Sequence, residues 1–93
     1  MLTQTAEVEI ERPARYGKQL ASHMGNKLKV EEIQGGWKLT FDIGEGTLIA
    51  TDTHLVMTSA AENIDDLQKI QYALVKHLIK FASKLGELDI TWK

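Results

Sequence analysis

Residues Asn63 to Leu85, NIDDLQKIQYALVKHLIKFASKL, carry the clearest structural pattern in this chain of 93 residues. Apolar side chains and one glutamine recur there at spacings of three and four, which is the period of an amphipathic helix. The stripe consists of Ile64, Leu67, Gln71, Leu74, Leu78, Phe81 and Leu85. Asn63 is a suitable N-cap and Gly86 a suitable stop. The stretch therefore predicts one long helix that buries a single side.

The chain is expected to begin with a strand and a first helix. Thr5 to Ile10 alternates apolar and acidic residues, which predicts a half-buried strand. Pro13 then suits the first turn of a helix that runs to about Met24 and ends at Gly25. The expected buried arc of that helix is Tyr16, Gly17, Leu20, Ala21 and Met24.

Between the two helices the pattern changes to period two, interrupted by glycines. Leu28 and Val30 begin a strand that ends at Gly35-Gly36, and Trp37 to Ile43 form the most clearly alternating strand. Gly44 to Gly46 is interpreted as a hairpin loop, followed by strands around Leu48 and Ala50 and around Leu55 and Met57. After the long helix, Leu88, Ile90 and Trp92 predict a last strand.

The predicted order is thus β-α-β-β-β-β-α-β in a single domain covering residues 1–93. This order indicates an α+β, two-layer sandwich with a mainly antiparallel sheet and both helices on one face. The other face of the sheet is expected in water, because its side chains are polar. They are Glu7, Glu9, Lys29, Glu31, Lys38, Asp42, Thr47 and Thr58.

Composition narrows the functional classes. The net charge of −2 predicts no general attraction to nucleic acid or to anionic membranes, although a local basic patch is compatible with it. The chain has no cysteine, so disulfides, thiolate zinc sites and cysteine nucleophiles are excluded. The first residues lack the pattern of a signal peptide, and no apolar run has the length of a membrane span. We therefore expect a cytoplasmic protein.

Known chemical motifs are absent from the sequence. The GEG at Gly44 to Gly46 lacks the remaining spacing of a dinucleotide fingerprint, and we expect no cofactor. His23, His54 and His77 have no metal-ligand spacing, so we expect no metal site. His77 is interpreted as a packed, hydrogen-bonded residue at the margin of the core. An enzyme is the least expected class, because no nucleophile–base pair can be assembled and no catalytic residue is predicted.

One group of polar residues suggests ligand binding. Arg12, Tyr16, Gln19 and His23 follow spacings of four, three and four, which places them in one stripe along the first helix. Such a stripe can bind a small anion or another small molecule, with Arg12 as a permanent cation. The other interpretation is a packing margin in which Tyr16 is packed and Arg12 is solvated.

The long helix is more apolar than one sheet face requires. Tyr72, Val75 and Ile79 widen its apolar arc well beyond the usual stripe. These residues are expected to meet either the first helix or another subunit. The second alternative predicts a homodimer.

Several segments together resemble a bacterial family. RPARYGKQLASHMGNK at residues 12–27 follows the TAEVE strand, and HLIKFA begins at His77. With the central Trp37 strand and the terminal LDITWK, they resemble the domain of unknown function 2218. The resemblance implies small cytoplasmic bacterial proteins, some joined to or encoded beside siderophore-interacting flavin-dependent ferric reductases. It also implies a β-α-β4-α fold similar to TATA-binding-protein-like domains, and it implies no established activity.

Two functional classes remain open at this point. The first is a non-catalytic accessory or interaction module, connected with iron–siderophore handling and with such a reductase as its partner. The alternative is a small-anion binder that uses the stripe from Arg12 to His23. Nucleic-acid binding through the sheet is not expected, because the open face is rich in acid.

Overall fold

A computed structural model describes residues 1–93 and shows five strands, two helices and a final 3-10 turn. The elements are β1 (Leu2–Glu9), α1 (Pro13–Met24), β2 (Lys29–Ile33), β3 (Gly36–Phe41), β4 (Gly44–Ala50), β5 (His54–Ala61), α2 (Ile64–Phe81) and η1 (Ser83–Leu85). The α+β class and the element order up to the second helix are as predicted.

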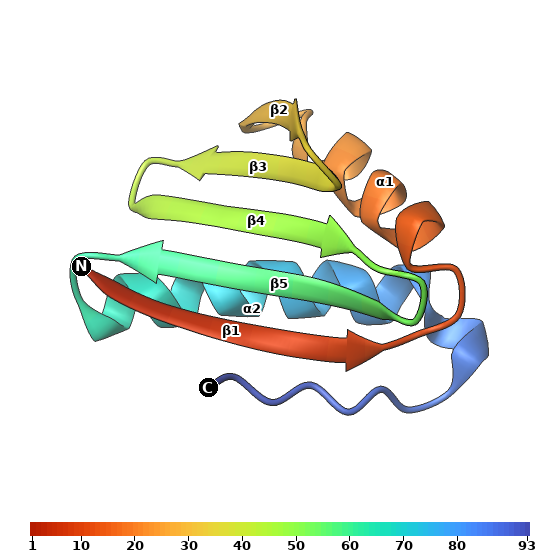
Figure 1. Ribbon diagram of the computed structural model, residues 1–93. Coiled ribbons are helices and arrows are strands. Elements are labelled where there is room, and N and C mark those ends of the chain that lie inside the picture. The colour runs from red at the N-terminus through yellow and green to blue at the C-terminus, as the bar shows by residue number, and fades with distance from the viewer.

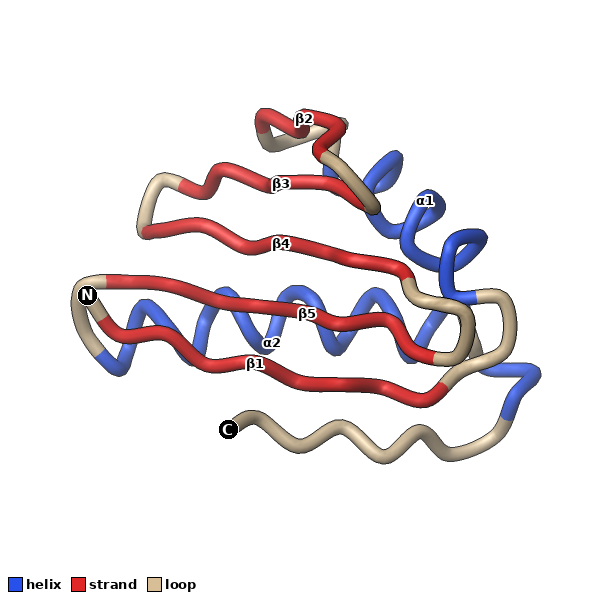
Figure 2. Tube along the Cα trace, in the orientation of Figure 1, coloured by secondary structure: helices blue, strands red, loops and turns tan.

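All five strands form one open antiparallel sheet in the order β1-β5-β4-β3-β2. The four strands between the helices form a meander, and β1 adds to its far side by pairing with β5. Both helices lie on the same face of the sheet, with α1 over the β3 side and α2 behind β5 and β1 (Figures 1 and 2). The predicted two-layer arrangement is therefore present.

The long helix begins where its sequence indicates. The Asn63 side chain accepts a hydrogen bond from the backbone N–H of Asp66 at 2.9 Å, which caps the first turn. The helix ends at Phe81, earlier than predicted, and η1 follows before Gly86. Its fully buried side chains are Leu67, Ile70, Leu74 and Leu78. Ile70 therefore belongs to the buried stripe, whereas Ile64 is 52% exposed.

The first helix approaches the sheet closely at a glycine. A Cβ at Gly17 would lie 2.8 Å from Cζ3 of Trp37 and 3.1 Å from Cδ1 of Leu55. Since real side chains essentially never show contacts as short as the first, a glycine here allows α1 to pack directly on β3 and β5. Leu20, Ala21 and Met24 on the same side of α1 are buried, as predicted.

Two details of the meander differ from the prediction. Phe41 pairs with Gly44, so the β3–β4 turn consists of Asp42 and Ile43, and Gly44 to Gly46 are strand residues. Gly44 has φ 158 and would place a Cβ 2.2 Å from the carbonyl oxygen of Ala60. The glycine was read as a loop residue, but it is needed for close strand packing.

The predicted last strand is absent as a regular element. Residues 86–93 run extended beside β1 in Figure 2, where they are drawn as loop. They pair with β1 through one residue: Thr5 and Lys93 exchange both backbone hydrogen bonds at 3.0 Å. The alternation was correct, because Leu88, Ile90 and Trp92 are half-buried. Apolar packing, with a single pair of ladder bonds, therefore places this segment.

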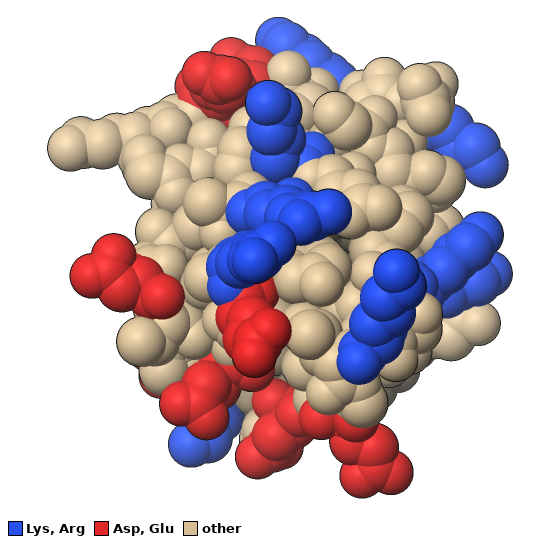
Figure 3. All heavy atoms as spheres, turned by 90° about the vertical axis from the view of Figure 1, so that its right-hand side faces the viewer, with Lys and Arg blue, Asp and Glu red and all other residues tan.

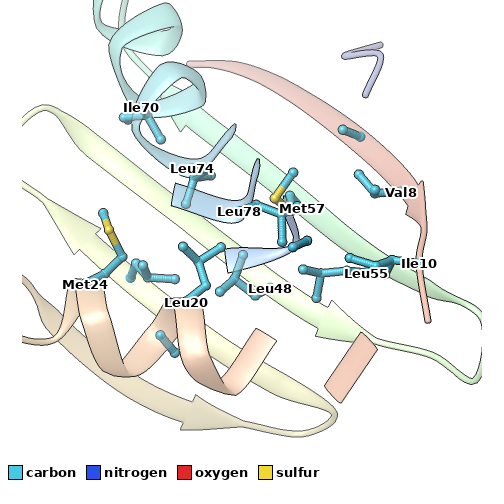
Figure 4. Packing of buried hydrophobic residues seen from close by; sticks show 14 of the residues in the cluster. Val8, Ile10, Leu20, Met24, Leu48, Leu55, Met57, Ile70, Leu74 and Leu78 are labelled. Carbon is cyan, nitrogen blue, oxygen red and sulfur yellow. The ribbon is translucent and has the colours of Figure 1, made fainter. Parts of the chain in front are cut away.

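The core lies between the sheet and the two helices (Figure 4). Leu39, Leu74 and Leu78 are fully buried, and the last two belong to the predicted stripe of the long helix. Trp37, Phe41, Phe81 and Trp92 are only partly buried, because they lie at the rim of the cluster. Neither helix is long and apolar enough to cross a lipid bilayer.

Candidate functional site

Charge is distributed very unevenly over this fold. Residues 12–28 and 67–86, which include α1 and most of α2, contain eight of the 11 Lys and Arg residues and none of the 13 Asp and Glu residues. We call these eight side chains the basic layer. They are Arg12, Arg15, Lys18, Lys27, Lys69, Lys76, Lys80 and Lys84. The net charge of −2 therefore conceals two stretches without acids, although the first turn of α2 holds Asp65 and Asp66.

None of the cations in the basic layer forms an ion pair. The two salt bridges of the protein, Lys29–Glu31 at 3.8 Å and Lys38–Glu45 at 3.4 Å, both lie on strands. Figure 3 shows Lys and Arg gathered across one side of the molecule and Asp and Glu gathered mainly along its lower edge. The cations of the layer thus have no ion-pair partner, although Asp65 lines the same shallow hollow as Lys69.

Two histidines meet within this layer, at the contact between the helices. The ring centroids of His23 on α1 and His77 on α2 are 4.4 Å apart, and their planes are tilted by 55°. Phe81 packs its ring at 5.3 Å from His23 and 6.4 Å from His77. We call these three residues the histidine cluster.

His77 is the unusual member of this cluster. Its Nδ1 atom is sealed from solvent and has no hydrogen-bond partner. Burial, followed by the charges of His23, Lys76, Lys80 and Lys27, lowers the pKa of His77 below its ordinary value of 6.5. The prediction of a packed, hydrogen-bonded histidine is therefore correct for the packing and wrong for the hydrogen bond.

The predicted stripe is divided by its surroundings. Arg12 caps α1 with a positive φ of 51°, which is uncommon outside glycine, and makes no side-chain capping bond. Tyr16 is half-buried, whereas Gln19 and His23 are exposed. Arg12 and His23 are separated by about 16 Å along the helix, given its rise per residue. The structure thus brings His23 together with His77 and away from Arg12.

The three predicted interface residues differ in exposure. Tyr72 is 68% exposed and Ile79 is 51% exposed. Val75 is half-buried and lines a shallow groove with Ile90 and Trp92 of the C-terminal segment. The last residues of the chain therefore cover part of the additional apolar surface of α2. This contact was not among the predicted alternatives.

Residue-by-residue reading of the sequence missed the basic layer and the histidine cluster. The basic layer was detectable from the sequence. A count of charges for each predicted element would have shown no acid in the first helix and none in the long helix after residue 66. The meeting of His23 and His77 was not detectable, since it depends on where the helices contact each other. His54, the third histidine, is the first residue of β5 and is not part of this cluster. Its Nδ1 forms a hydrogen bond with Thr53 Oγ1 at 2.7 Å.

Comparisons with known proteins agree with the fold. The NMR structure of PA4090 from Pseudomonas aeruginosa superimposes with a TM-score of 0.85 and 30% sequence identity, covering 100% of this chain and 96% of that one. No curated protein gives a significant match. Residues 5–93 match the model of a family described as an uncharacterized protein conserved in bacteria, DUF2218. The chain therefore belongs to the DUF2218 family of bacterial proteins.

Proposed function

We propose that this protein is a non-catalytic interaction module that binds an acidic surface of a partner protein through its basic layer. The observation that supports the proposal is the absence of any Asp or Glu in residues 12–28 and 67–86, which hold eight cations and include α1 and all of α2 after its first turn. Complementary charge steers two proteins together and fixes their relative orientation. An acidic partner would neutralise charges that the fold itself leaves unpaired.

Fold stability accounts for only part of this arrangement, because Lys80 in the last turn of α2 complements the helix dipole but other cations do not. Arg15 lies in the first turn of α1, where the positive end of the helix dipole disfavours a cation, and that turn contains no acidic residue. Lys76 and Lys80 are one turn apart on α2, and like charges at this spacing repel each other. Residues that weaken their own helices are typical of positions kept for binding.

A protein is favoured over nucleic acid as the partner. Tyr72 and Ile79 are exposed on α2 among the cations, and Tyr and exposed aliphatic side chains are suited to a desolvated protein contact. The remaining chain contains all 13 acids and only three of the cations, so its field opposes a long polyanion. A compact acidic surface can contact the layer without approaching the acidic edge.

The first partner to test is of the kind that the family resemblance implied, a siderophore-interacting flavin-dependent reductase. In that role the module would act as an accessory in iron–siderophore handling. The basic layer would supply the recognition, and the reductase would supply the chemistry.

An acidic peptide is a direct probe of this proposal. We expect an oligoglutamate peptide to shift amide resonances of α1 and α2, with an affinity that falls as salt rises, because the attraction is Coulombic. The double variant Lys76→Gln/Lys80→Gln should bind several-fold more weakly. The matched variant Lys29→Gln/Lys38→Gln has the same net charge but changes only the sheet, and it should bind like the wild type.

Equal weakening in both double variants would contradict the proposal, since it would reveal a response to net charge alone. Stronger binding of an oligothymidine than of the peptide would replace the protein partner with nucleic acid. Self-association is the other alternative, through Tyr72, Val75 and Ile79. Sedimentation of the wild type as a dimer, and of Ile79→Glu as a monomer, would assign this surface to a second copy instead.

A further inference from the structure

We infer that the histidine cluster is a proton-linked anion subsite of the basic layer, which receives a carboxylate of the acidic partner. The inference rests on the proposed function and adds to it the position of the main contact and its dependence on pH. The anion subsite consists of the two imidazoles of the cluster, His23 and His77. Lys27, Lys76 and Lys80 lie around them.

The geometry provides donors without any internal acceptor. The two imidazoles lie at a centroid distance of 4.4 Å, and Nδ1 of His77 has no hydrogen-bond partner in the chain. In His77 only Nδ1 is sealed, so Nε2 is the ring nitrogen that solvent or a ligand can reach. Phe81 packs against both rings, while His23 is exposed to solvent. A carboxylate placed here would find N–H donors on both rings.

Every charged group that faces His77 is a cation. His23 and Lys27 approach from α1 and the residues after it, and Lys76 and Lys80 lie on α2 itself. A charge on either imidazole therefore opposes a charge on the other, and the three lysines oppose both. These charges favour a neutral His77, which is the direction of its lowered pKa.

An anion reverses this balance. A carboxylate beside His77 stabilises the imidazolium and raises its pKa, so binding and proton uptake assist each other by linkage. Affinity for the acidic partner then increases as pH falls toward and below neutrality, where carboxylates of the partner remain ionised. A patch made of lysines alone would show no such change, because lysines keep their charge throughout this range.

The test is a titration of the imidazole resonances with and without oligoglutamate, between about pH 5.5 and 7.5. We expect the peptide to raise the pKa of His77 in the wild type. The affinity for oligoglutamate should rise about threefold to tenfold for each unit by which the pH is lowered, since uptake of one proton gives at most a tenfold change. His77→Asn and His23→Asn should flatten this dependence, and His54→Asn, at the start of β5, should retain it.

The possible failures are distinguishable. Binding on the helices without a change in the His77 titration would overturn the subsite and leave the interaction module in place. Absence of any peptide binding would overturn both. Because the wild-type titration is decisive by itself, the inference stays testable even if one of the histidine variants proves less stable.

Discussion

The two faces of this molecule treat charge in opposite ways. On the open face of the sheet, Thr5, Thr58, Thr47, Lys38 and Glu31 are aligned in one cross-strand row. Thr5 and Thr58 share a hydrogen bond at 3.2 Å, and Lys38 pairs with Glu45 at 3.4 Å. On the helical layer, by contrast, eight cations and two histidines have no acidic partner.

This difference separates charge that belongs to the fold from charge that does not. Cross-strand pairs stabilise a sheet locally, and Lys38 and Glu45 form such a pair on the polar face, which also carries Glu7 and Glu9 without an ion pair. The cations of the helices form no ion pair, although Lys76 Nζ lies 5.8 Å from the centroid of the Tyr72 ring and Lys80 complements the dipole of α2. The contrast therefore supports the proposal that the helical layer, rather than the outer sheet face, binds a partner.

The largest expected effect comes from the core that joins the two layers. Leu78 on α2 is fully buried, whereas the next residue, Ile79, is 51% exposed. Leu78→Ala should lower the free energy of unfolding by about 2–5 kcal/mol, because it leaves a cavity between helix and sheet. Ile79→Ala is the matched control and should cost far less. Comparable losses in urea denaturation would show that the orientation of α2 is wrong.

Much of the fold followed from local patterns in the sequence. The Asn63 cap, the helix from Pro13 to Met24 and the antiparallel meander were predicted from spacing and turn residues. The prediction of a C-terminal strand was wrong for a physical reason. Alternation reports which side chains face the core, but a strand also needs a ladder of backbone bonds, and residues 86–93 form only the Thr5–Lys93 pair. The pattern of Leu88, Ile90 and Trp92 reported packing alone.

The candidate site was less accessible to sequence reasoning. His23 was correctly placed on α1, in a stripe with Arg12, Tyr16 and Gln19, and the binding role of that stripe stays a prediction. The neighbour of His23 in the cluster, His77, is 54 positions away in sequence and is brought close by the contact of the two helices. A similar limit applies to Gln71, which was counted in the apolar stripe. It donates to Gln4 Oε1 at 2.8 Å and to Ser59 Oγ at 3.0 Å in a polar network under α2.

A smaller effect is expected from the titration of His77. Its pKa is lowered in the folded protein, so the unfolded state binds more protons just below the ordinary value of 6.5. Stability contributed by the neutral ring is thus complete above about pH 6.5 and is lost as pH falls toward the lowered folded pKa. His77→Phe retains an aromatic ring beside Phe81 and removes this loss. Denaturation curves of the two proteins should therefore diverge on acidification, and parallel curves would contradict the lowered pKa.

The smallest effects are expected from two substitutions that each remove one positive charge, one on the sheet face and one on the helical layer. Lys38→Gln removes the partner of Glu45 from a partly exposed pair, so it should destabilise the protein by no more than a few tenths of a kcal/mol. Arg15→Gln removes an unpaired cation from the first turn of α1, where the helix dipole disfavours it. This second change should stabilise the protein by roughly 0.3–1 kcal/mol at low salt. Because both variants have the same net charge, opposite signs in denaturation at low salt, converging as salt is added, would show that position decides the effect. Destabilisation by Arg15→Gln would instead mean that Arg15 contributes to the fold, and the basic layer would lose one of the residues that argue for binding.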